Sequence, residues 1–248
     1  MIMLKSRDEI AILRIGNRIA AEILNVLSKE VKVGVTTLEL EKIAECEIKK
    51  RGAISAFKGY NGYPASICTS VNEVVVHGIP SYRKLEEGDI ISLDIGVNYK
   101  GYCGDVSETF AVGKINEKKR KLMDVTKKAL YLGINEAKDG NRVGDISNAV
   151  QTFVESNGFS VVRDFVGHGI GKSVHEEPQV PNFGKKEQGP RLKPGMVLAI
   201  EPMVNLGCLD VEILKDGWTA VTKDKLPSAH FEHTVVILED KTEILTQI

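Results

Sequence analysis

One ten-residue pattern occurs twice in the chain, as Leu85-Glu86-Glu87-Gly88-Asp89-Ile90-Ile91-Ser92-Leu93-Asp94 and as Leu192-Lys193-Pro194-Gly195-Met196-Val197-Leu198-Ala199-Ile200-Glu201. Leucine, glycine, an apolar run, a small residue, an apolar residue and a carboxylate keep their places at an offset of 107 positions. A glycine turn before a run of Ile, Val and Leu is typical of a buried central strand. Both copies end in a carboxylate, and a charge at the end of a buried strand costs free energy unless another group pairs with it.

A second repeat supports the first. A helical pattern between Gly34 and Gly52 returns between Gly140 and Gly158, at an offset of 106 positions. Two copies with so long a period exclude a solenoid. We therefore predict a single catalytic domain over residues 1–248, with related halves at about 1–112 and 113–248. Each half is expected to contain two helices followed by strands.

Capping signals and apolar spacing locate the helices. Ser6 and Thr36 each precede a glutamate by three residues, which is the capping-box spacing at the start of a helix. Gly52 suits the end of the second helix. In the second half, helical patterns cover about residues 117–137 and 145–156.

Composition excludes several classes of protein. The chain is 42% hydrophobic and 27% charged, which is ordinary for a globular protein, and its net charge is −1. Such a charge gives no general attraction for nucleic acid or anionic lipid, so neither is predicted as a partner. The four cysteines form no C-x-x-C pair, which excludes a zinc ribbon and fits a reducing cytoplasm. We expect neither a signal peptide nor a membrane span.

Two carboxylates are expected to meet in a hairpin of the first half. Asn98-Tyr99-Lys100-Gly101 has the composition of a turn. If Tyr99 and Lys100 form its centre, Asp94 lies directly opposite Asp105. Opposed Cβ atoms are roughly 5 Å apart, and like charges there are destabilising, whereas a divalent cation between them reverses that interaction. The alternative, that Asp105 is a solvated strand residue, stays open at this point.

The second half contains further candidate ligands. His168 stands among glycines in Phe165-Val166-Gly167-His168-Gly169-Ile170-Gly171, where a ligand can approach the backbone closely. Glu201 ends the repeated strand, and Glu232 lies in an apparent strand at 229–237. A lone histidine is more often a hydrogen-bonded core residue. The set is a stronger signal, because Asp94 and Glu201 occupy equivalent repeat positions.

Seven motifs occur together in order: Val76-His77-Gly78-Ile79-Pro80, Leu93-Asp94-Ile95-Gly96, Gly104-Asp105, Gly167-His168-Gly169-Ile170-Gly171, His175-Glu176-Glu177-Pro178, Ile200-Glu201-Pro202 and Glu232-His233-Thr234. With them, the chain resembles the type I methionine aminopeptidases of the bacterial kind over essentially its whole length. This resemblance implies the α+β "pita-bread" fold, in which two pseudo-symmetric halves surround a central site. A curved, antiparallel-rich sheet covered by helices is then expected.

The resemblance also implies a dinuclear metal site. Its ligands would be Asp94, Asp105, His168, Glu201 and Glu232, and their four negative charges balance two divalent cations. One imidazole with many oxygens suits Co, Mn, Fe, Zn or Ni, and the sequence does not decide among these ions. A single bound Ca²⁺ or Mg²⁺ is disfavoured by His168.

The implied activity is that of a metal-dependent methionyl aminopeptidase, a hydrolase and exopeptidase. An activated water would attack the first peptide carbonyl, with Glu201 as proton acceptor. His175 would stabilise the oxyanion, and His77 would contact the substrate amide or the leaving group. The expected result is removal of the initiator methionine during protein maturation, with a preference for small second residues.

Residues matching the substrate site of that family are His77, His175, Tyr60, Tyr63, Cys68, Val174 and Trp218. Aromatic rings and sulfur suit a thioether side chain. Two positions depart from the pattern: Val174 replaces an aromatic residue, and Phe57 stands where better-known members have cysteine. A monovalent-cation site would correspond to Asn72, Val74 and Ser228.

The predicted partners are the N-termini of nascent polypeptides, in the cytoplasm and transiently near the ribosome, with the enzyme as a monomer. Two other functions stay open. One is a proline-directed aminopeptidase or dipeptidase of the same fold, and the other is a binding module that keeps the fold without catalysis. H-E-x-x-H and G-x-S-x-G motifs are absent, and Val166 replaces the first glycine that a P-loop needs.

Overall fold

The computed structural model describes every residue from 1 to 248. Ser6 and Thr36 cap the first two helices as predicted, because each side-chain oxygen accepts a hydrogen bond from the backbone N–H three residues later. The fourth helix begins two residues earlier than predicted, since the Asp145 carboxylate accepts a hydrogen bond from the Arg142 N–H. No helix is both long and apolar enough to cross a membrane. The helices are α1 (Arg7–Ser28), α2 (Thr37–Lys50), α3 (Glu117–Glu136) and α4 (Val143–Ser156).

The strands form one nine-stranded sheet and two three-stranded sheets. The large sheet has the order β1-β4-β5-β14-β9-β7-β8, with β2 also paired to β4 and β15 also paired to β14. All of its pairs are antiparallel, as predicted. The bounds are β1 (Ile54–Ser55), β2 (Cys68–Val71), β3 (Val74–Val76), β4 (Ile90–Tyr99), β5 (Tyr102–Ala111), β6 (Ser160–Val161), β7 (Gly167–Gly169), β8 (Glu176–Val180), β9 (Val197–Ile200), β10 (Met203–Asn205), β11 (Val211–Ile213), β12 (Ala220–Thr222), β13 (Ser228–His230), β14 (Glu232–Ile237) and β15 (Thr242–Ile244), with a 3-10 turn at Tyr60–Gly62.

The hairpin of β4 and β5 has a different register from the predicted one. Its turn is centred on Lys100 and Gly101, and both have a positive φ (51° and 84°), as a type I′ turn requires. Asp94 consequently pairs with Ser107 rather than with Asp105. The prediction of directly opposed carboxylates is therefore wrong. A shift of two residues nevertheless keeps both carboxylates on one face of the sheet.

The two copies of the ten-residue repeat have the same local structure. Gly88 and Gly195 have φ values of 91° and 90°, and their turns lead into β4 and β9. Gly34 and Gly140, at the start of the second repeated segment, have φ values of 90° and 88°. Side chains of L-residues rarely allow this conformation, so the turns need glycine. The repeated glycines thus specify the same turns in both halves.

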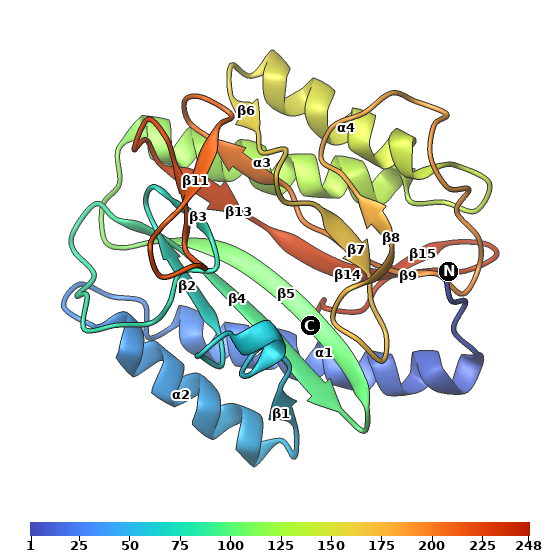
Figure 1. Ribbon diagram of the computed structural model, residues 1–248, viewed down its shortest axis with the longest axis horizontal. Helices are drawn as coiled ribbons and strands as arrows, with labels where there is room; N and C mark the ends of the chain where they lie inside the picture. The colour runs from blue at the N-terminus through green and yellow to red at the C-terminus, as the bar shows by residue number, and fades with distance from the viewer.

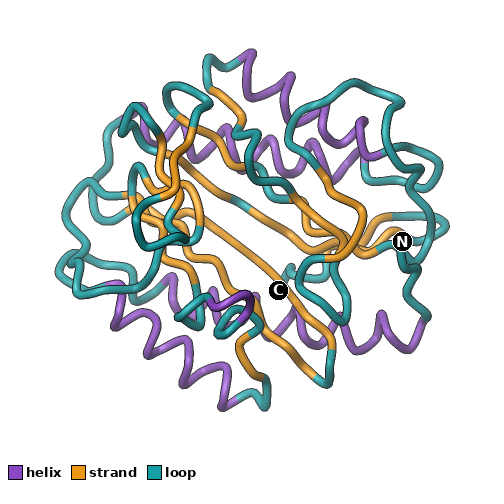
Figure 2. Tube along the Cα trace, in the orientation of Figure 1, coloured by secondary structure: helices purple, strands orange, loops and turns teal.

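Two hydrophobic clusters attach the helices to the large sheet. One joins α1 and α2 to β4 and β5, and the other joins α3 and α4 to β9 and β14. Figure 1 shows α1 and α2 at the bottom of the view and α3 and α4 at the top, and Figure 2 shows the strands between the two pairs. Leu93 and Ile95 belong to the first cluster, so strand alternation turns Asp94 to the other face. Ile200 in the second cluster does the same for Glu201.

Helix α1 fixes the start of β5 by close contact. A Cβ atom on Gly104 would lie 2.7 Å from the backbone nitrogen of Asn17, so only glycine allows the helix to lie so near. The buried Asn17 side chain donates a hydrogen bond to Leu13 O and accepts one from the Asp105 N–H at 3.2 Å. These bonds hold the backbone of Asp105, and its side chain leaves the sheet on the opposite face.

Candidate metal centre and active site

A cavity of ≈ 580 Å³ brings together all five predicted metal ligands. Asp94 comes from the middle of β4, Asp105 from β5 and His168 from β7. Glu201 directly follows β9, and Glu232 begins β14. Strand pairing therefore gathers residues that are far apart in the sequence on the sheet face that the helices leave uncovered.

Ligand atoms of three of these residues form a group that could hold a metal ion. One atom each of Asp105, His168 and Glu232 lies within 4.8 Å of the other two. Glu201 Oε1 lies 3.3 Å from His168 Nε2. Asp94 joins them through the sheet, because its cross-strand partner Ser107 also pairs with Glu232. The cavity thus concentrates negative charge from several strands at one place.

Buried polar atoms that have no hydrogen-bond partner gather at this site. Of six such side-chain atoms, three are oxygens of the predicted ligands: Asp94 Oδ1, Asp105 Oδ1 and Glu232 Oε1. Ser107 Oγ and His230 Nε2 are two more. An unsatisfied buried polar group typically costs about 1–3 kcal/mol, so each calls for a missing partner. The residues therefore fit divalent cations, which four carboxylates and one imidazole would bind.

The carboxyl groups have raised pKa values. Burial raises the pKa of Asp94 to about 7, an effect that His230 opposes and the Glu201 charge reinforces. Burial is also the main reason why the pKa values of Asp105, Glu201 and Glu232 lie well above their ordinary range. Carboxylates that share a buried site disfavour one another's charged form. A bound cation reverses this effect and stabilises the ionised groups.

His168 presents a free lone pair to the cavity. Its Nδ1 lies 3.0 Å from Gly169 O, and because a carbonyl can only accept, Nδ1 carries the proton. Burial lowers the pKa of His168 to about 3, so the ring is neutral near pH 7. Nε2 is then unprotonated and faces Glu201 Oε1. A histidine whose second nitrogen is tied to a carbonyl is the usual form of a metal-binding imidazole.

The glycines beside His168 allow neighbouring strands to approach closely. A Cβ atom on Gly167 would lie 2.5 Å from Ala199 O in β9. One on Gly169 would overlap the backbone carbonyl of Glu177 in β8. The close approach expected around this histidine is thus made by adjacent backbone, which fixes the position of β7.

Two further predicted imidazoles line the cavity. His175 Nδ1 lies 2.9 Å from Tyr60 Oη, and its ring packs edge-on against His168 with centroids 4.4 Å apart. His77 packs edge-on against Phe165 at 5.3 Å and has an uncommon positive φ of 59°. Burial lowers the pKa of both, that of His77 to about 4. Both rings are therefore neutral near pH 7.

An aromatic pocket forms part of the same cavity. Tyr63 packs edge-on against Trp218 at 5.2 Å, and Cys68 belongs to the same small cluster. Phe57 packs against this cluster and also lines the cavity. Its ring occupies the space that a side chain at Gly96 would need. The predicted pocket residues other than Val174 thus lie around the cavity.

Val174 is placed differently from the prediction. Its side chain is 3% exposed and packs with Ile10, Leu13 and Ile170 in a separate hydrophobic cluster. It does not line the cavity, although His175 beside it does. Val174 thus packs in the core next to the cavity, and its role in the methionine pocket stays a prediction.

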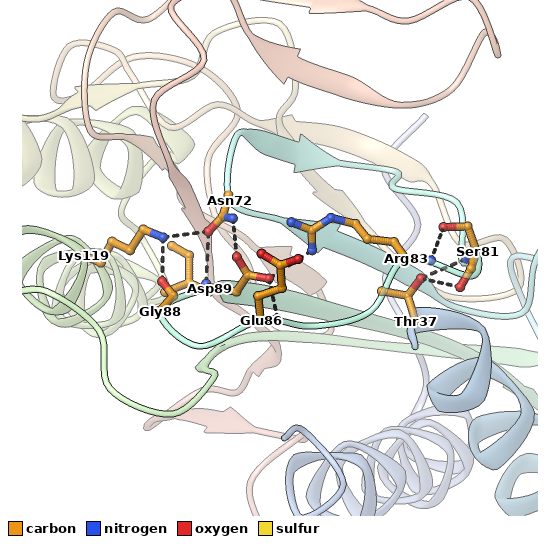
Figure 3. Close-up of polar contacts among 9 residues, drawn as sticks. Thr37, Asn72, Ser81, Arg83, Glu86, Gly88, Asp89 and Lys119 are labelled. Atoms are coloured by element: carbon orange, nitrogen blue, oxygen red, sulfur yellow. Dashed lines mark hydrogen bonds and ion pairs between the residues drawn. The ribbon is translucent and has the colours of Figure 1, made fainter. Parts of the chain in front are cut away.

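The residues predicted for a monovalent cation lie beside the start of β4, where the Asn72 N–H donates a hydrogen bond to Ile90 O. The Ser228 N–H donates a hydrogen bond to Asn72 O at 2.8 Å, and Val74 begins β3 two residues after Asn72. Figure 3 shows the Asn72 side chain between Asp89 Oδ1, at 2.6 Å, and the Lys119 ammonium group, at 2.9 Å. A positive charge of the protein therefore already lies at the Asn72 side chain.

His230 is a cavity residue that the sequence analysis missed. Its side chain is buried, its Nε2 has no hydrogen-bond partner, and this atom lies 3.6 Å from Glu201 Oε2. Burial lowers its pKa and favours the neutral ring. His230 stands two residues before Glu232, and the two-residue period of a strand would have placed both on one face.

Comparison with known proteins identifies the family. A model described as metallopeptidase family M24 matches residues 11–239. The chain belongs to metallopeptidase family M24. As an M24 enzyme it is a metallopeptidase, so the cavity with its converging carboxylates is the expected position of the metal centre.

Individual relatives cover the whole M24 domain. The chain is 54% identical over 248 residues to methionine aminopeptidase 1 of Bacillus subtilis, with complete coverage of both proteins. The structure of methionine aminopeptidase from Thermotoga maritima superposes with a TM-score of 0.98 at 44% identity, again over all of both chains. The prolidase from Pyrococcus furiosus gives a TM-score of 0.80 at 25% identity, and only 65% of that chain is covered. The pita-bread M24 fold is thereby confirmed.

Proposed function

We propose that this M24 enzyme removes methionine from the N-terminus of polypeptides by metal-dependent hydrolysis. The observation that carries the proposal is the convergence of Asp94, Asp105, His168, Glu201 and Glu232 at one cavity, with three of their oxygens lacking any partner. Full-length identity of 54% to a methionine aminopeptidase supports the choice of substrate.

The five ligands would hold two divalent cations. Ions of this kind, when bound, activate water and polarise the scissile carbonyl. Four carboxylates neutralise two such ions, and the His168 lone pair supplies the single nitrogen donor. Co, Mn, Fe, Zn and Ni all accept this mixture of oxygen and nitrogen donors.

Three side chains would act on the substrate directly. Glu201 would accept a proton from the attacking water, because it lies at the edge of the cavity with one carboxylate oxygen facing His168 and the other facing His230. With the Tyr60 hydroxyl, 2.9 Å away, as the donor to His175 Nδ1, the His175 Nε2–H would be free to donate to the developing oxyanion. His77 lies in the same cavity and would contact the substrate amide or the leaving group.

The aromatic pocket would select the methionine side chain. Tyr63, Trp218 and Cys68 offer ring faces, ring edges and sulfur to a thioether, each contact contributing about 0.3–1.5 kcal/mol. Phe57 narrows the same region because its ring extends to Gly96. The second residue of the substrate would lie just outside this pocket, where a small side chain would be favoured.

The biological setting proposed here follows from the substrate. The partners would be nascent chains with an initiator methionine, met in the cytoplasm and transiently near the ribosome. Residues 1–248 would act as one catalytic domain with two related halves, as a monomer. A monovalent cation would bind at Asn72, Val74 and Ser228, where two of the three are already hydrogen-bonded to each other.

The decisive experiment compares two peptides. The purified protein, with Mn²⁺ or Co²⁺ added, is incubated with Met-Ala-Ser and with Ala-Pro-Ala, and the released amino acids are quantified. Methionine should be released from the first peptide, with no alanine released from the second. Chelation should abolish the release, and adding the ion back should restore it.

Either of two results would contradict the proposal. Release of alanine from Ala-Pro-Ala without release of methionine would identify a proline-directed peptidase. Binding of peptide or metal without release from either substrate would identify a non-catalytic binding module. The His175→Ala variant serves as the control for contaminating peptidase, because its activity should fall by about 100- to 1,000-fold on loss of an oxyanion donor.

A further inference from the structure

His230 is a buried imidazole in the cavity that the proposed mechanism does not use. It ends β13, and its ring nitrogen Nε2 has no hydrogen-bond partner. Phe231, the next residue, packs into the hydrophobic cluster of α3 and α4, so His230 and Glu232 both turn toward the cavity. A buried polar atom without a partner is unusual in a native protein and indicates an interaction that is completed in another state.

Glu201 is the group that Nε2 of His230 faces. Glu201 Oε2 lies 3.6 Å from His230 Nε2, and Glu201 Oε1 lies 3.3 Å from His168 Nε2. Each carboxylate oxygen therefore faces a different imidazole. The two imidazoles differ, however, because the Nδ1 proton of His168 is fixed by Gly169 O and its Nε2 has none to give. His230 has no such constraint, so its proton can lie on Nε2.

The side chain of Glu201 needs support from outside its own strand. Glu201 follows the last residue of β9, and Asn182 holds its backbone carbonyl through a hydrogen bond of 3.0 Å. No hydrogen-bond donor of the protein lies within bonding distance of its carboxylate, and His230 Nε2 is one of the two ring nitrogens that face it. His230 is thus the imidazole placed to hold Glu201 Oε2.

We propose that His230 is a positioning residue, whose Nε2–H donates a hydrogen bond to Glu201 Oε2 when the metal centre is filled. This bond leaves Glu201 Oε1, on the His168 side, for the metal ion. It also fixes the rotamer of the group that accepts the proton. The distance between His230 Nε2 and Glu201 Oε2 must shorten by about half an ångström for this bond to form. Such a movement is expected, because hydrogen bonds at active sites often tighten only on binding. The proposal rests on the proposed metal-dependent function.

Two substitutions of His230 distinguish a hydrogen-bond donor from a side chain that only fills space. His230→Leu keeps the volume but removes the donor, whereas His230→Gln keeps an N–H group at similar reach. With His230→Leu, we expect Mn²⁺ affinity measured by isothermal titration calorimetry to fall by about 10- to 100-fold, and kcat for Met-Ala-Ser to fall by a similar factor with KM nearly unchanged. His230→Gln should recover most of both losses.

A spectroscopic measurement reports on the proton itself. In Zn²⁺-loaded protein with ¹⁵N-labelled histidine, long-range ¹H–¹⁵N correlation should show His230 protonated at Nε2 and His168 protonated at Nδ1. His233→Leu is the matched control, because His233 lies three residues further along, in β14, and is hydrogen-bonded to Thr246 at 2.8 Å on the other face. It should lower the melting temperature and leave Mn²⁺ affinity unchanged.

Three outcomes would overturn the proposal. These are Mn²⁺ affinity in His230→Leu equal to that of the wild type, equal loss in His230→Gln and His230→Leu, and an Nε2 of His230 that is unprotonated and bound to Zn²⁺. Failure of the wild-type protein to bind any divalent ion would instead refute the proposed function, and this proposal with it. The wild-type titration therefore distinguishes the two failures.

Discussion

The two halves of the molecule use the same turn and strand but support their carboxylates differently. Asp94 lies in the middle of the ten-residue strand β4, between β2 and β5, and pairs with Cys68 on one side and Ser107 on the other. Glu201 follows the four-residue strand β9 and precedes Pro202. The first carboxylate is therefore held by the sheet, whereas the second depends on side chains around it.

The imidazoles of the cavity divide unevenly between the halves. His77 comes from the first half, and His168, His175 and His230 come from the second. The repeated sequence thus builds a duplicated scaffold for two carboxylates, but the groups that handle protons are concentrated beside Glu201. The two repeat positions should consequently respond differently to substitution.

The largest effect is expected when either repeat carboxylate loses its charge. Asp94→Asn and Glu201→Gln should each lower kcat/KM for Met-Ala-Ser by at least about 100-fold, because a bound cation contributes several kcal/mol to the transition state. In the metal-free protein, Asp94→Asn should raise the melting temperature above pH 7, since it replaces a carboxyl whose pKa burial raises to about 7 and whose charge therefore destabilises the folded state.

Asp139→Asn is the control for this comparison, because Asp139 is exposed in the turn after α3. It should keep both activity and melting temperature. Full activity in either repeat variant would contradict the two-metal site. A lower melting temperature in metal-free Asp94→Asn would show that β4 needs the charged carboxylate for folding rather than for ion binding.

Much of this arrangement could be predicted from the sequence, and the failures have physical causes. Helix starts at Ser6 and Thr36 are encoded locally, by caps that need only three residues. The register of the β4–β5 hairpin depends on which two residues form the centre of its turn. Composition alone does not show that Lys100 takes a positive φ and shares the centre with Gly101. The packing of Val174 in the core could not be predicted, because a loop carries no periodicity that tells inward from outward side chains.

His230 shows a different failure. The alternation of His230, Phe231 and Glu232 was available in the sequence, and Phe231 is indeed buried in the core. A histidine alone carries no signature of function, so only Glu232 of this segment was predicted as a ligand. The repeat pointed to Asp94 and Glu201, the family resemblance supplied the other three ligands, and His230, which belongs to neither, was missed.

A smaller effect should appear in the pH dependence of the metal-free protein. Between about pH 6.5 and 8.5 the melting temperature should fall. The site carboxyls have folded pKa values raised to about 7 or higher, against about 4 in the unfolded chain, so the folded state holds extra protons that it loses as pH rises. The buried histidines oppose this fall only near pH 6.5, where they are neutral in the folded state and still partly protonated in the unfolded chain.

Differential scanning fluorimetry across this pH range, with EDTA or with saturating Mn²⁺, measures the effect. The increase in melting temperature caused by Mn²⁺ should be larger at pH 8 than at pH 6.5, because the ion competes with protons for the same oxygens. Metal-free protein whose melting temperature rises steadily with pH would contradict the buried, repulsive carboxyl cluster.

The smallest effect concerns the helix starts in equivalent positions of the two halves. Thr36 caps α2 with its side chain, whereas Arg142 before α4 contributes only its backbone N–H, which Asp145 accepts at 2.8 Å. Thr36→Ala should lower the free energy of unfolding by about 1 kcal/mol, and Arg142→Ala by no more than about 0.5 kcal/mol. Asp145→Ala should cost more than Arg142→Ala, because it also removes a hydrogen bond from the Glu187 N–H. Urea titrations with unchanged m-values would measure these differences, and equal losses in Thr36→Ala and Arg142→Ala would show that capping does not distinguish the halves.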